Sequence, residues 1–253
     1  MNSGRAERCA MAIMAKAPRV GDAKTRLVPT LSPAEAARLS AAFIRDAAEK
    51  IAMAAREAPI DGYIAYTPAD AAAEFAPLLA DGTGLLPSRR SGLGFSLHDA
   101  VEDLLGAGFG AVCLINSDSP TLPISVLVDA ARALAEPGDR LVLGPAEDGG
   151  YYLIGVKRLH IRLFADIAWS TAAVFAQTMA RAREIGLETV VLPHWYDVDD
   201  IASLQRLAAE LHGLPEDGAA GPARQTAAFL RGLLRQREDL RSGGATAAGC
   251  CRS

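Results

Sequence analysis

Basic residues are concentrated in the loop that follows the first apolar run of the chain, where a phosphate group could be held. Residues 15–27 read AKAPRVGDAKTRL and come directly after the apolar run 9–14. A cationic turn that contains glycine, placed just after a strand, offers positive charge and backbone N–H groups to a phosphate. No complete G-x-x-x-x-G-K-S/T motif is present, so an ordinary polar connection is the alternative. The residues of this loop that we assign to a nucleotide are Ala15, Lys16, Gly21, Lys24 and Arg26.

Carboxylates follow two other apolar runs. Asp118 comes shortly after the run 111–115, and Asp197 and Asp199 come shortly after the run 189–192. A carboxylate at the end of a strand suits Mg²⁺ or Mn²⁺, because proteins hold such ions with one or two carboxylates plus substrate phosphates. Asp197 and Asp199 would share one face of an extended backbone. The alternatives are a turn or helix cap at Asp118 and acids in the first turn of the next helix, for which Asp200 is the expected cap.

Three further segments offer groups that could contact a ligand. The segment 144–152, GPAEDGGYY, joins two predicted strands; its paired glycines allow close approach to a ligand, and Asp-Gly is also a hairpin signal. The Gly/Arg loop 85–95 suits a nucleobase or a phosphate, or it is a solvated connection. The segment 169–171, Trp-Ser-Thr, is favoured as a helix cap on its residues alone. The candidate ligand contacts in these segments are Arg90, Gly92, Gly94, Glu147, Asp148, Gly149, Gly150, Tyr151, Trp169, Ser170 and Thr171.

Strand-like and helix-like segments alternate along the chain. Strands are predicted at 9–15, 63–66, 111–115, 140–143, 151–156 and 189–192, and helices at 33–57, 71–79, 96–105, 125–135, 171–185, 201–211 and 222–241. This alternation predicts an α/β fold with a mostly parallel sheet flanked by helices. Ligands of such sheets lie beyond the carboxyl ends of the strands, so the loops described above should converge on one crevice. We expect one domain over 8–212, followed over 213–253 by a C-terminal helix and a flexible tail.

The composition argues against several classes of function. The chain has 253 residues, a net charge of −4 and 50% hydrophobic residues, which argues for a globular enzyme and against a nucleic-acid-binding surface. No apolar stretch approaches the roughly 18 residues that a membrane span needs, and a cytoplasmic protein is expected. The four cysteines, including Cys250 and Cys251 at the C-terminus, are too scattered for a disulfide framework or a zinc site. The four histidines lack ligand spacing and a partnered Ser or Cys, so no hydrolytic triad is predicted.

Taken together and in this order, the segments resemble a known family of bacterial transferases. The chain is similar to glycosyltransferases associated with arsenosugar biosynthesis or with radical-SAM and selenodomain proteins, within the nucleotide-diphospho-sugar transferase (GT-A) superfamily. The resemblance spans about residues 9–211, and GPAEDGGYYLIG is its most specific part. The basic loop and the following SPAEAARL are also similar to 2-phospholactate guanylyltransferase. The resemblance implies a single GT-A (Rossmann-like) domain.

The same resemblance implies roles for individual residues. Lys24 and Arg26 would lie on the phosphates of the nucleotide with Lys16 nearby, while Asp118 and Asp199 would be the metal-binding aspartates. This chain reads DVDDIASL and NSDSPTLP where many relatives have a D-x-D-T-P-E-D-like segment and a Thr-Asp-Cys-Pro string. Neither change removes a carboxylate. The second one could alter the acceptor pocket, so the acceptor is not carried over.

Two transferase mechanisms and one alternative without catalysis are compatible with these expectations. In the first, a nucleotide sugar donates its glycosyl group to a small-molecule acceptor whose hydroxyl Asp148 orients. In the second, a phosphorylated small molecule attacks the α-phosphate of a nucleoside triphosphate (NTP) and pyrophosphate leaves. Both depend on positioning and charge neutralisation, for which we expect Lys24, Arg26, Asp118 and Asp148 to be the catalytic residues. Glycosyl transfer is favoured, and a non-catalytic nucleotide-binding module is the remote alternative. The helix 33–57 either faces a partner, as in a homodimer, or covers the sheet.

Overall fold

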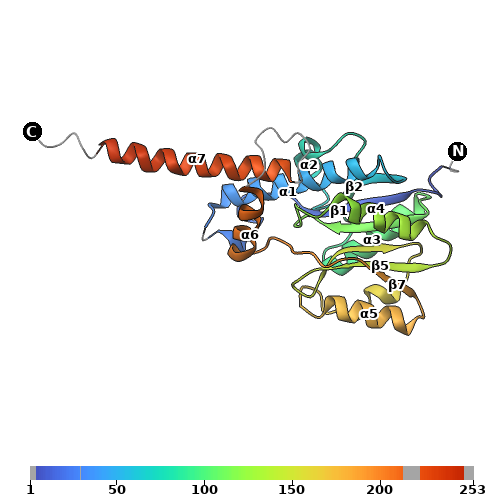
Figure 1. The fold of residues 1–253 in the computed structure, drawn as a ribbon. Coiled ribbons are helices and arrows are strands. Elements are labelled where there is room, and N and C mark those ends of the chain that lie inside the picture. Colours follow the sequence, from blue (N-terminus) through green and yellow to red (C-terminus); the bar gives the residue numbers. More distant parts are fainter. Residues whose placement is uncertain (1–3, 29, 213–222, 248–253) are drawn as a thin grey trace, which may run out of the picture.

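The computed structural model describes residues 4–28, 30–212 and 223–247, and its centre is a seven-stranded sheet (Figure 1). The strand order is β3-β2-β1-β4-β6-β5-β7. The strands are β1 (Cys9–Lys16), β2 (Ile60–Thr67), β3 (Gly84–Pro87), β4 (Ala111–Asn116), β5 (Arg140–Pro145), β6 (Tyr151–Val156) and β7 (Glu188–Val191). The helices are α1 (Pro33–Ala54), α2 (Ala72–Phe75), α3 (Leu93–Gly106), α4 (Ile124–Ala135), α5 (Val174–Glu184), α6 (Ile201–His212) and α7 (Arg224–Ala247).

Most strands of the sheet run in the same direction. β1 pairs in parallel with β2 and β4, β2 pairs in parallel with β3, and β5 pairs in parallel with β7. Among the described strands, only β6 runs antiparallel to its neighbours, which are β4 and β5. The carboxyl ends of β1, β2, β3 and β4 therefore meet at one edge of the sheet. The predicted α/β fold with a mostly parallel sheet flanked by helices is confirmed.

The two faces of the sheet are covered by different helices. Met11 and Ile13 of β1 belong to an apolar cluster that includes residues of α1 and α4. Ala10 and Ala12 belong to a second cluster, which includes residues of α3 and α5. This alternation is the period of two that a strand buried on both faces requires. The central strands thus have no solvent-exposed face, which fixes the positions of their carboxyl ends.

Helix α7 packs against α1 and then extends beyond the body of the molecule (Figure 1). Ala227 and Leu233 of α7 lie in an apolar cluster with Leu39 and Phe43 of α1. None of the described helices, α7 included, has the length and apolarity that a membrane crossing requires. Residues 213–222, and the end of the expected flexible tail with Cys250 and Cys251, lie outside the described residues. The start of that tail is helical, because α7 reaches Ala247 and not the predicted end at 241. The predicted division between 8–212 and 213–253 therefore stays a prediction.

The structure differs from the predicted elements at several places, and three of them lie near the edge of the sheet or at helix starts. The segment 85–95, predicted as a loop, contains most of β3 and the start of α3, which begins at Leu93 and not at residue 96. β3 is only four residues long and lies at the edge of the sheet, so it gives almost no periodic signal. A short 3-10 helix over Ile161–Phe164 was not predicted, and α5 begins at Val174, after the expected start at 171.

Helix α1 begins at a capping box, which the sequence Ser32-Pro33-Ala34-Glu35 signals by a serine three residues before a glutamate, and this yields a stability test. The backbone N–H of Glu35 donates to Ser32 Oγ at 3.3 Å, and Glu35 accepts from the backbone N–H of Ser32 at 2.7 Å. Ser32→Ala should lower the free energy of unfolding by about 1 kcal/mol, measured by urea denaturation. Glu35→Gln should cost less, because an amide oxygen still accepts the Ser32 N–H. Equal losses in both variants would contradict this account.

Candidate active site

A cavity of about 880 Å³ lies at the carboxyl ends of β1, β2 and β4. Most of the predicted site residues line it, although they come from distant parts of the chain. These are Ala15, Lys16, Lys24, Arg26, Gly92, Asp118, Asp148, Gly150, Tyr151, Trp169, Ser170, Thr171, Asp197 and Asp199. The predicted residues outside this lining are Gly21, Arg90, Gly94, Glu147 and Gly149. The fold thus brings the basic loop and the aspartates to one place.

Lys24 lies between two of the predicted metal-binding aspartates. Its Nζ is 2.9 Å from Asp118 Oδ1 and 2.8 Å from Asp199 Oδ1, and its side chain is only 7% exposed. Burial alone would lower the pKa of Lys24, but the charges of Asp118 and Asp199 outweigh burial and raise it. Lys24 is therefore a buried ammonium ion at neutral pH. Its backbone is in the left-handed region, with φ at 50°, a conformation that a lysine adopts only when its surroundings hold it there.

The segments that carry these aspartates are tied to each other through their main chains. The N–H of Val198 donates to the carbonyl oxygen of Asp118 at 2.9 Å, and Lys24 Nζ donates to the carbonyl oxygen of Val198 at 2.8 Å. Ser119 Oγ donates to the carbonyl oxygen of Tyr196 at 3.0 Å. These bonds fix the end of β4 against the segment that leads into α6.

Neither Asp118 nor Asp199 serves as the cap of a helix. Helix α4 has Pro123 at its N-cap position, and α6 is capped by Asp200, whose Oδ1 accepts from the N–H of Ser203 at 2.8 Å. The cap that the sequence predicts at Asp200 is confirmed. Asp118 and Asp199 are left to face Lys24 and the cavity.

Asp197 adds a further acidic group at the same place. Burial, together with the charges of Asp148 and Asp199 and then Asp118, raises the pKa of Asp197 to about 6. Asp118 and Asp199 both contact Lys24 Nζ, while Asp148 and Asp197 line the same cavity, so carboxylates are concentrated there. Carboxylate oxygens are the ligands that Mg²⁺ and Mn²⁺ prefer. Within the described residues, Asp118, Asp197 and Asp199 do not form a cluster with the spacing of metal ligands, so their metal-binding role stays a prediction.

The other basic residues of the loop 15–27 separate into two groups. Lys16 and Arg26 are exposed and line the cavity. Arg19 instead forms an ion pair with Glu74 of α2, at 2.6 Å, and does not line the cavity. Gly21 also lies outside the lining, and its φ of 88° is a left-handed conformation that glycine adopts readily. Positive charge from Lys16 and Arg26 therefore remains available at the cavity, while Lys24 is paired with Asp118 and Asp199.

The turn between β5 and β6 is both a hairpin connection and part of the cavity wall. Asp148 Oδ1 accepts the N–H of Gly150 at 2.8 Å, and both residues line the cavity. Gly149 has a φ of 89°, and a Cβ there would lie 2.3 Å from the carbonyl oxygen of Ala172. That glycine allows the segment after Thr171 to approach the turn. Glu147 pairs with Arg206 at 2.8 Å, outside the lining.

The Gly/Arg loop before α3 contributes backbone and small side chains to the cavity, and its arginines lie elsewhere. Arg90 Nε donates to Asp99 Oδ2 at 2.9 Å, and its guanidinium lies 4.6 Å from the centre of the Phe95 ring. A Cβ at Gly94 would lie 2.3 Å from Nε1 of Trp169, so this glycine makes room for the indole. Gly92 lines the cavity. A nucleotide role for Arg90 and Gly94 stays a prediction.

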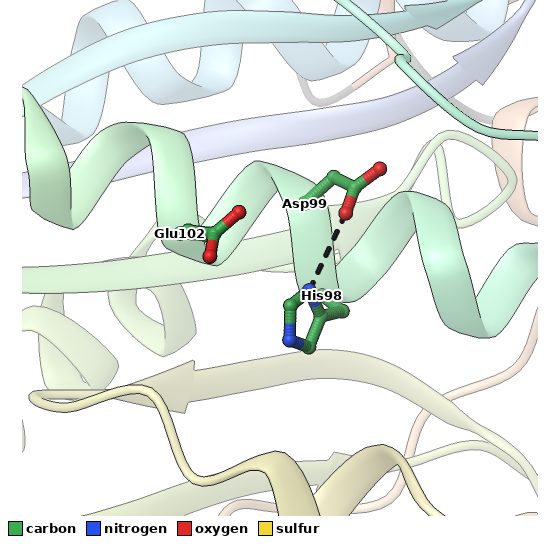
Figure 2. A group of neighbouring side chains, drawn as sticks. All are labelled: His98, Asp99 and Glu102. Atoms are coloured by element: carbon green, nitrogen blue, oxygen red, sulfur yellow. Dashed lines mark hydrogen bonds and ion pairs between the residues drawn. The ribbon is translucent and has the colours of Figure 1, made fainter.

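A second acidic group that the sequence analysis overlooked lies on α3. Figure 2 shows His98, Asp99 and Glu102 side by side, and their spacing would allow them to share a metal ion. His98 Nδ1 lies 3.3 Å from Asp99 Oδ1. Arg90 and Arg89, however, already pair with the carboxylates of Asp99 and Glu102 respectively. These arginines neutralise the group, as Lys24 neutralises Asp118 and Asp199, so a metal ion would have to displace them.

Several lining residues were not predicted, and some of them had a detectable signal. Thr67 and Asn116 line the cavity and are the last residues of β2 and β4. Their position at strand ends was readable from the sequence, because parallel strands place their last residues at the ligand edge. Ser40 lines the cavity from α1, and nothing in its sequence context indicates this.

The raised pKa of Asp197 predicts how stability depends on pH. An acid with a higher pKa in the folded state than in the unfolded state costs stability as pH rises from about 4 to about 6. In EDTA at pH 8, Asp197→Asn should therefore raise the free energy of unfolding by about 2 to 3 kcal/mol, at about 1.4 kcal/mol per pH unit. The gain should disappear near pH 4. Urea denaturation at a series of pH values measures it.

Asp200→Asn is the matched control for this measurement. Hydrogen bonds from Ser203 lower the pKa of Asp200, so this substitution should reduce stability at pH 8, with the opposite sign. If Asp197→Asn instead lowered the free energy of unfolding at pH 8, the raised pKa of Asp197 would be contradicted.

The folds of several solved structures are similar to this one. A candidate nucleotide-diphospho-sugar transferase from Desulfovibrio desulfuricans G20 aligns with a TM-score of 0.77 and 28% identity over 90% of this chain and 97% of its own. CMP:2-keto-3-deoxy-manno-octonic acid synthetase, complexed with CTP, aligns at 0.52 and 11% identity over 81% and 98% of the two chains. The 4-diphosphocytidyl-2C-methyl-D-erythritol synthase of Anaerococcus prevotii DSM 20548 aligns at 0.54 and 9% identity over 84% and 100%.

The sequence comparisons give the family. A comparison with curated proteins found no significant match. A family profile described as "Uncharacterized protein conserved in bacteria (DUF2064)" matches residues 38–171, which is just over half of the chain. The matched segment contains Asp118, Asp148 and Trp169, while the basic loop and the aspartates near α6 lie outside it. On this match the chain belongs to the DUF2064 family, and its fold is that of the nucleotide-diphospho-sugar transferases.

Proposed function

We propose that this protein is a metal-dependent transferase that uses a nucleotide-activated donor, and that it transfers a glycosyl group to a small-molecule acceptor. An enzyme of the transferase class is supported by the similar structures, which are named as transferases and synthetases of nucleotide chemistry. The observation that carries the proposal is the meeting, in one cavity, of Asp118 and Asp199 with the cations Lys16, Lys24 and Arg26. A phosphate chain bridged by a divalent ion is the ligand that such a pairing of charges fits.

Each group would have a distinct part in glycosyl transfer. Asp118 and Asp199, with Asp197, would hold Mg²⁺ or Mn²⁺, which when bound neutralises charge on the donor's diphosphate. Lys16 and Arg26 would bind phosphate oxygens directly. The oxygen of the acceptor hydroxyl forms a bond to the anomeric carbon while the bond from that carbon to the diphosphate oxygen breaks. Asp148, in the turn that lines the cavity, would accept a hydrogen bond from that hydroxyl and take its proton.

The narrower resemblance to arsenosugar-associated glycosyltransferases belongs to this proposal. It favours a small-molecule acceptor and a glycosyl donor. The cavity volume of about 880 Å³ is large enough for both. The acceptor side would be formed by Asp148, Tyr151 and Trp169, which lie on segments other than the basic loop.

Nucleotidyl transfer is the second candidate, and the number of cations favours it. Of the described residues, Lys16 and Arg26 line the cavity beside Lys24, which is paired with Asp118 and Asp199, and their positive charges suit the phosphates of a triphosphate. In that reaction a phosphate oxygen of the acceptor bonds to the α-phosphorus, and the bond to the pyrophosphate oxygen breaks. The same aspartates and the same basic loop would serve.

Calorimetric titration separates the two candidates. Nucleoside triphosphates and nucleotide sugars would each be titrated with and without Mn²⁺, with Asp118→Asn as the control variant. Tight metal-dependent binding of one nucleotide sugar supports glycosyl transfer, and Asp118→Asn should weaken it by at least about tenfold. Metal-dependent binding of a triphosphate, with weak binding of every sugar nucleotide, would favour nucleotidyl transfer. Nucleotide binding that is the same with and without Mn²⁺, and the same in Asp118→Asn as in the wild type, would contradict the proposed site.

The position of Lys24 predicts that its substitution has opposite effects on the affinity for Mn²⁺ and on the affinity for nucleotide. Lys24→Met removes the cation that neutralises Asp118 and Asp199, so Mn²⁺ alone should bind more tightly. Nucleotide should bind about tenfold or more weakly, because the contacts of Lys24 Nζ with Asp118, Asp199 and the carbonyl oxygen of Val198 hold in place the basic loop that carries Lys16 and Arg26. Mn²⁺ titration followed by electron paramagnetic resonance measures the first effect, and calorimetry measures the second. Arg19→Ala, which removes a cation of the same loop outside the cavity, should change neither. Weaker binding of Mn²⁺ in Lys24→Met would contradict the role given to Lys24.

A further inference from the structure

Helix α1 buries two charged side chains one turn apart that lie outside the cavity lining. Asp46 is 2% exposed and Lys50 is 5% exposed. Burying a charged group lowers the stability of the fold unless hydrogen bonds satisfy it. The hydrogen-bond partners of each side chain therefore show which segments it fixes. The partners of Lys50 lie beside the site, and those of Asp46 lie on α7.

Lys50 holds the main chain that follows Asp118. Its Nζ donates to the carbonyl oxygen of Ser119 at 2.8 Å and to that of Pro120 at 2.9 Å. These are the first two residues after Asp118. Ser119 is also buried and bonded through its hydroxyl to the carbonyl oxygen of Tyr196. The ammonium group of Lys50 therefore fixes the loop that carries one proposed metal ligand and that contacts the segment carrying the others.

Asp46 holds the first turn of α7. Its Oδ1 accepts from the N–H of Gln225 at 2.8 Å, and its Oδ2 accepts from the N–H of Thr226 at 2.9 Å and from Thr226 Oγ1 at 2.6 Å. N–H groups in the first turn of a helix have no partner within the helix, and a carboxylate from another element can cap them. Thr226 is fully buried. Asp46 is thus the cap of α7, supplied by α1.

The two buried charges also act on each other. Burial lowers the pKa of Lys50 to about 7, and the charge of Asp46 opposes this shift. Burial raises the pKa of Asp46, and its hydrogen bonds from Thr226 and Gln225 oppose that shift. The N–H groups of α7 therefore favour the charged form of Asp46, and Asp46 in turn favours the ammonium form of Lys50.

We propose that Lys50 is a positioning residue for the Asp118 site and that Asp46 couples it to the docking of α7. The metal-binding role of Asp118 rests on the proposed function. The coupling between Lys50, Asp46 and α7 rests only on their hydrogen bonds in the structure. Helix α7 lies outside the segment 38–171 that the family profile matches, so the chain uses a segment beyond that match to fix its metal-binding loop. If the pair only stabilised the fold, its loss would lower stability and leave ligand affinity unchanged.

Four full-length variants test the coupling. Lys50→Met removes the ammonium group at similar length, Asp46→Asn removes the charge of the cap, and Thr226→Val removes one donor to Asp46. Glu49→Gln is the matched control, because Glu49 also joins α1 to α7, through Arg224 at 3.0 Å and Gln225 at 2.8 Å, on the surface and away from Lys50. Thr226→Val is the mildest change and serves as the deciding variant if the buried substitutions prevent folding.

The first measurement is hydrogen–deuterium exchange without any ligand, on variants that circular dichroism shows to be folded. Peptides covering 117–122 and 196–199 should exchange faster in Lys50→Met and Thr226→Val than in the wild type, and at the wild-type rate in Glu49→Gln. Unchanged exchange in both variants would overturn the coupling. This result does not depend on whether the protein binds metal or nucleotide, so it is independent of the proposed function.

The second measurement is Mn²⁺ affinity, by titration under conditions where each variant is fully folded. Lys50→Met should weaken Mn²⁺ binding by about tenfold or more, Asp46→Asn and Thr226→Val by smaller factors, and Glu49→Gln not at all. Wild-type affinity in folded Lys50→Met, despite faster exchange, would overturn its role as a positioning residue. If the wild type binds neither Mn²⁺ nor nucleotide, the proposed function is overturned. The hydrogen–deuterium exchange measurement still tests the coupling in that case.

Discussion

The contact of one ammonium group with two carboxylates organises the site. Lys24 reaches Asp118 at the end of β4 and Asp199 before α6, and it also bonds the carbonyl oxygen of Val198. Three segments that are far apart in the sequence are held together at this point. Because the group is buried, the interaction is little screened by solvent. The left-handed backbone of Lys24 is maintained by the same contacts. The position of the basic loop, and with it the placement of Lys16 and Arg26, depends on this buried ion contact.

Much of the architecture could be predicted because the chain repeats a simple pattern. The apolar runs at β1 and β4 and the capping box at Ser32 each give a strong local signal, and all three are found in the structure. β3 and the start of α3 were missed, since a four-residue edge strand has no detectable period. The antiparallel direction of β6 relative to β5 had a signal, because Asp-Gly between the two predicted strands indicates a hairpin. The pairing of β6 with β4 was hidden, since the residues of a single strand do not encode its neighbours.

The residues that gather at the cavity were predictable to the extent that they end strands. Asp118 follows β4, and the basic loop follows β1, so the ligand-edge rule for parallel sheets was enough to bring them together. The partners of the arginines were not predictable. Arg19 and Arg90 pair with acids on neighbouring helices, and only the three-dimensional packing decides whether a loop arginine faces the cavity. The contact of Lys50 with the carbonyl oxygens after Asp118 was likewise invisible, because a lysine on an alanine-rich helix is usually exposed.

The reversed direction of β6 brings a hairpin turn to the ligand edge of the sheet. Leu153 of β6 lies beside Ile115 of β4, so the first residues of β6, and not its last, are at that edge. The turn is bonded to the segment before α6, because the N–H of Glu147 donates to the carbonyl oxygen of Trp195 and the N–H of Trp195 donates to that of Pro145. A change in the length of this hairpin would therefore also shift the segment that leads to Asp197 and Asp199.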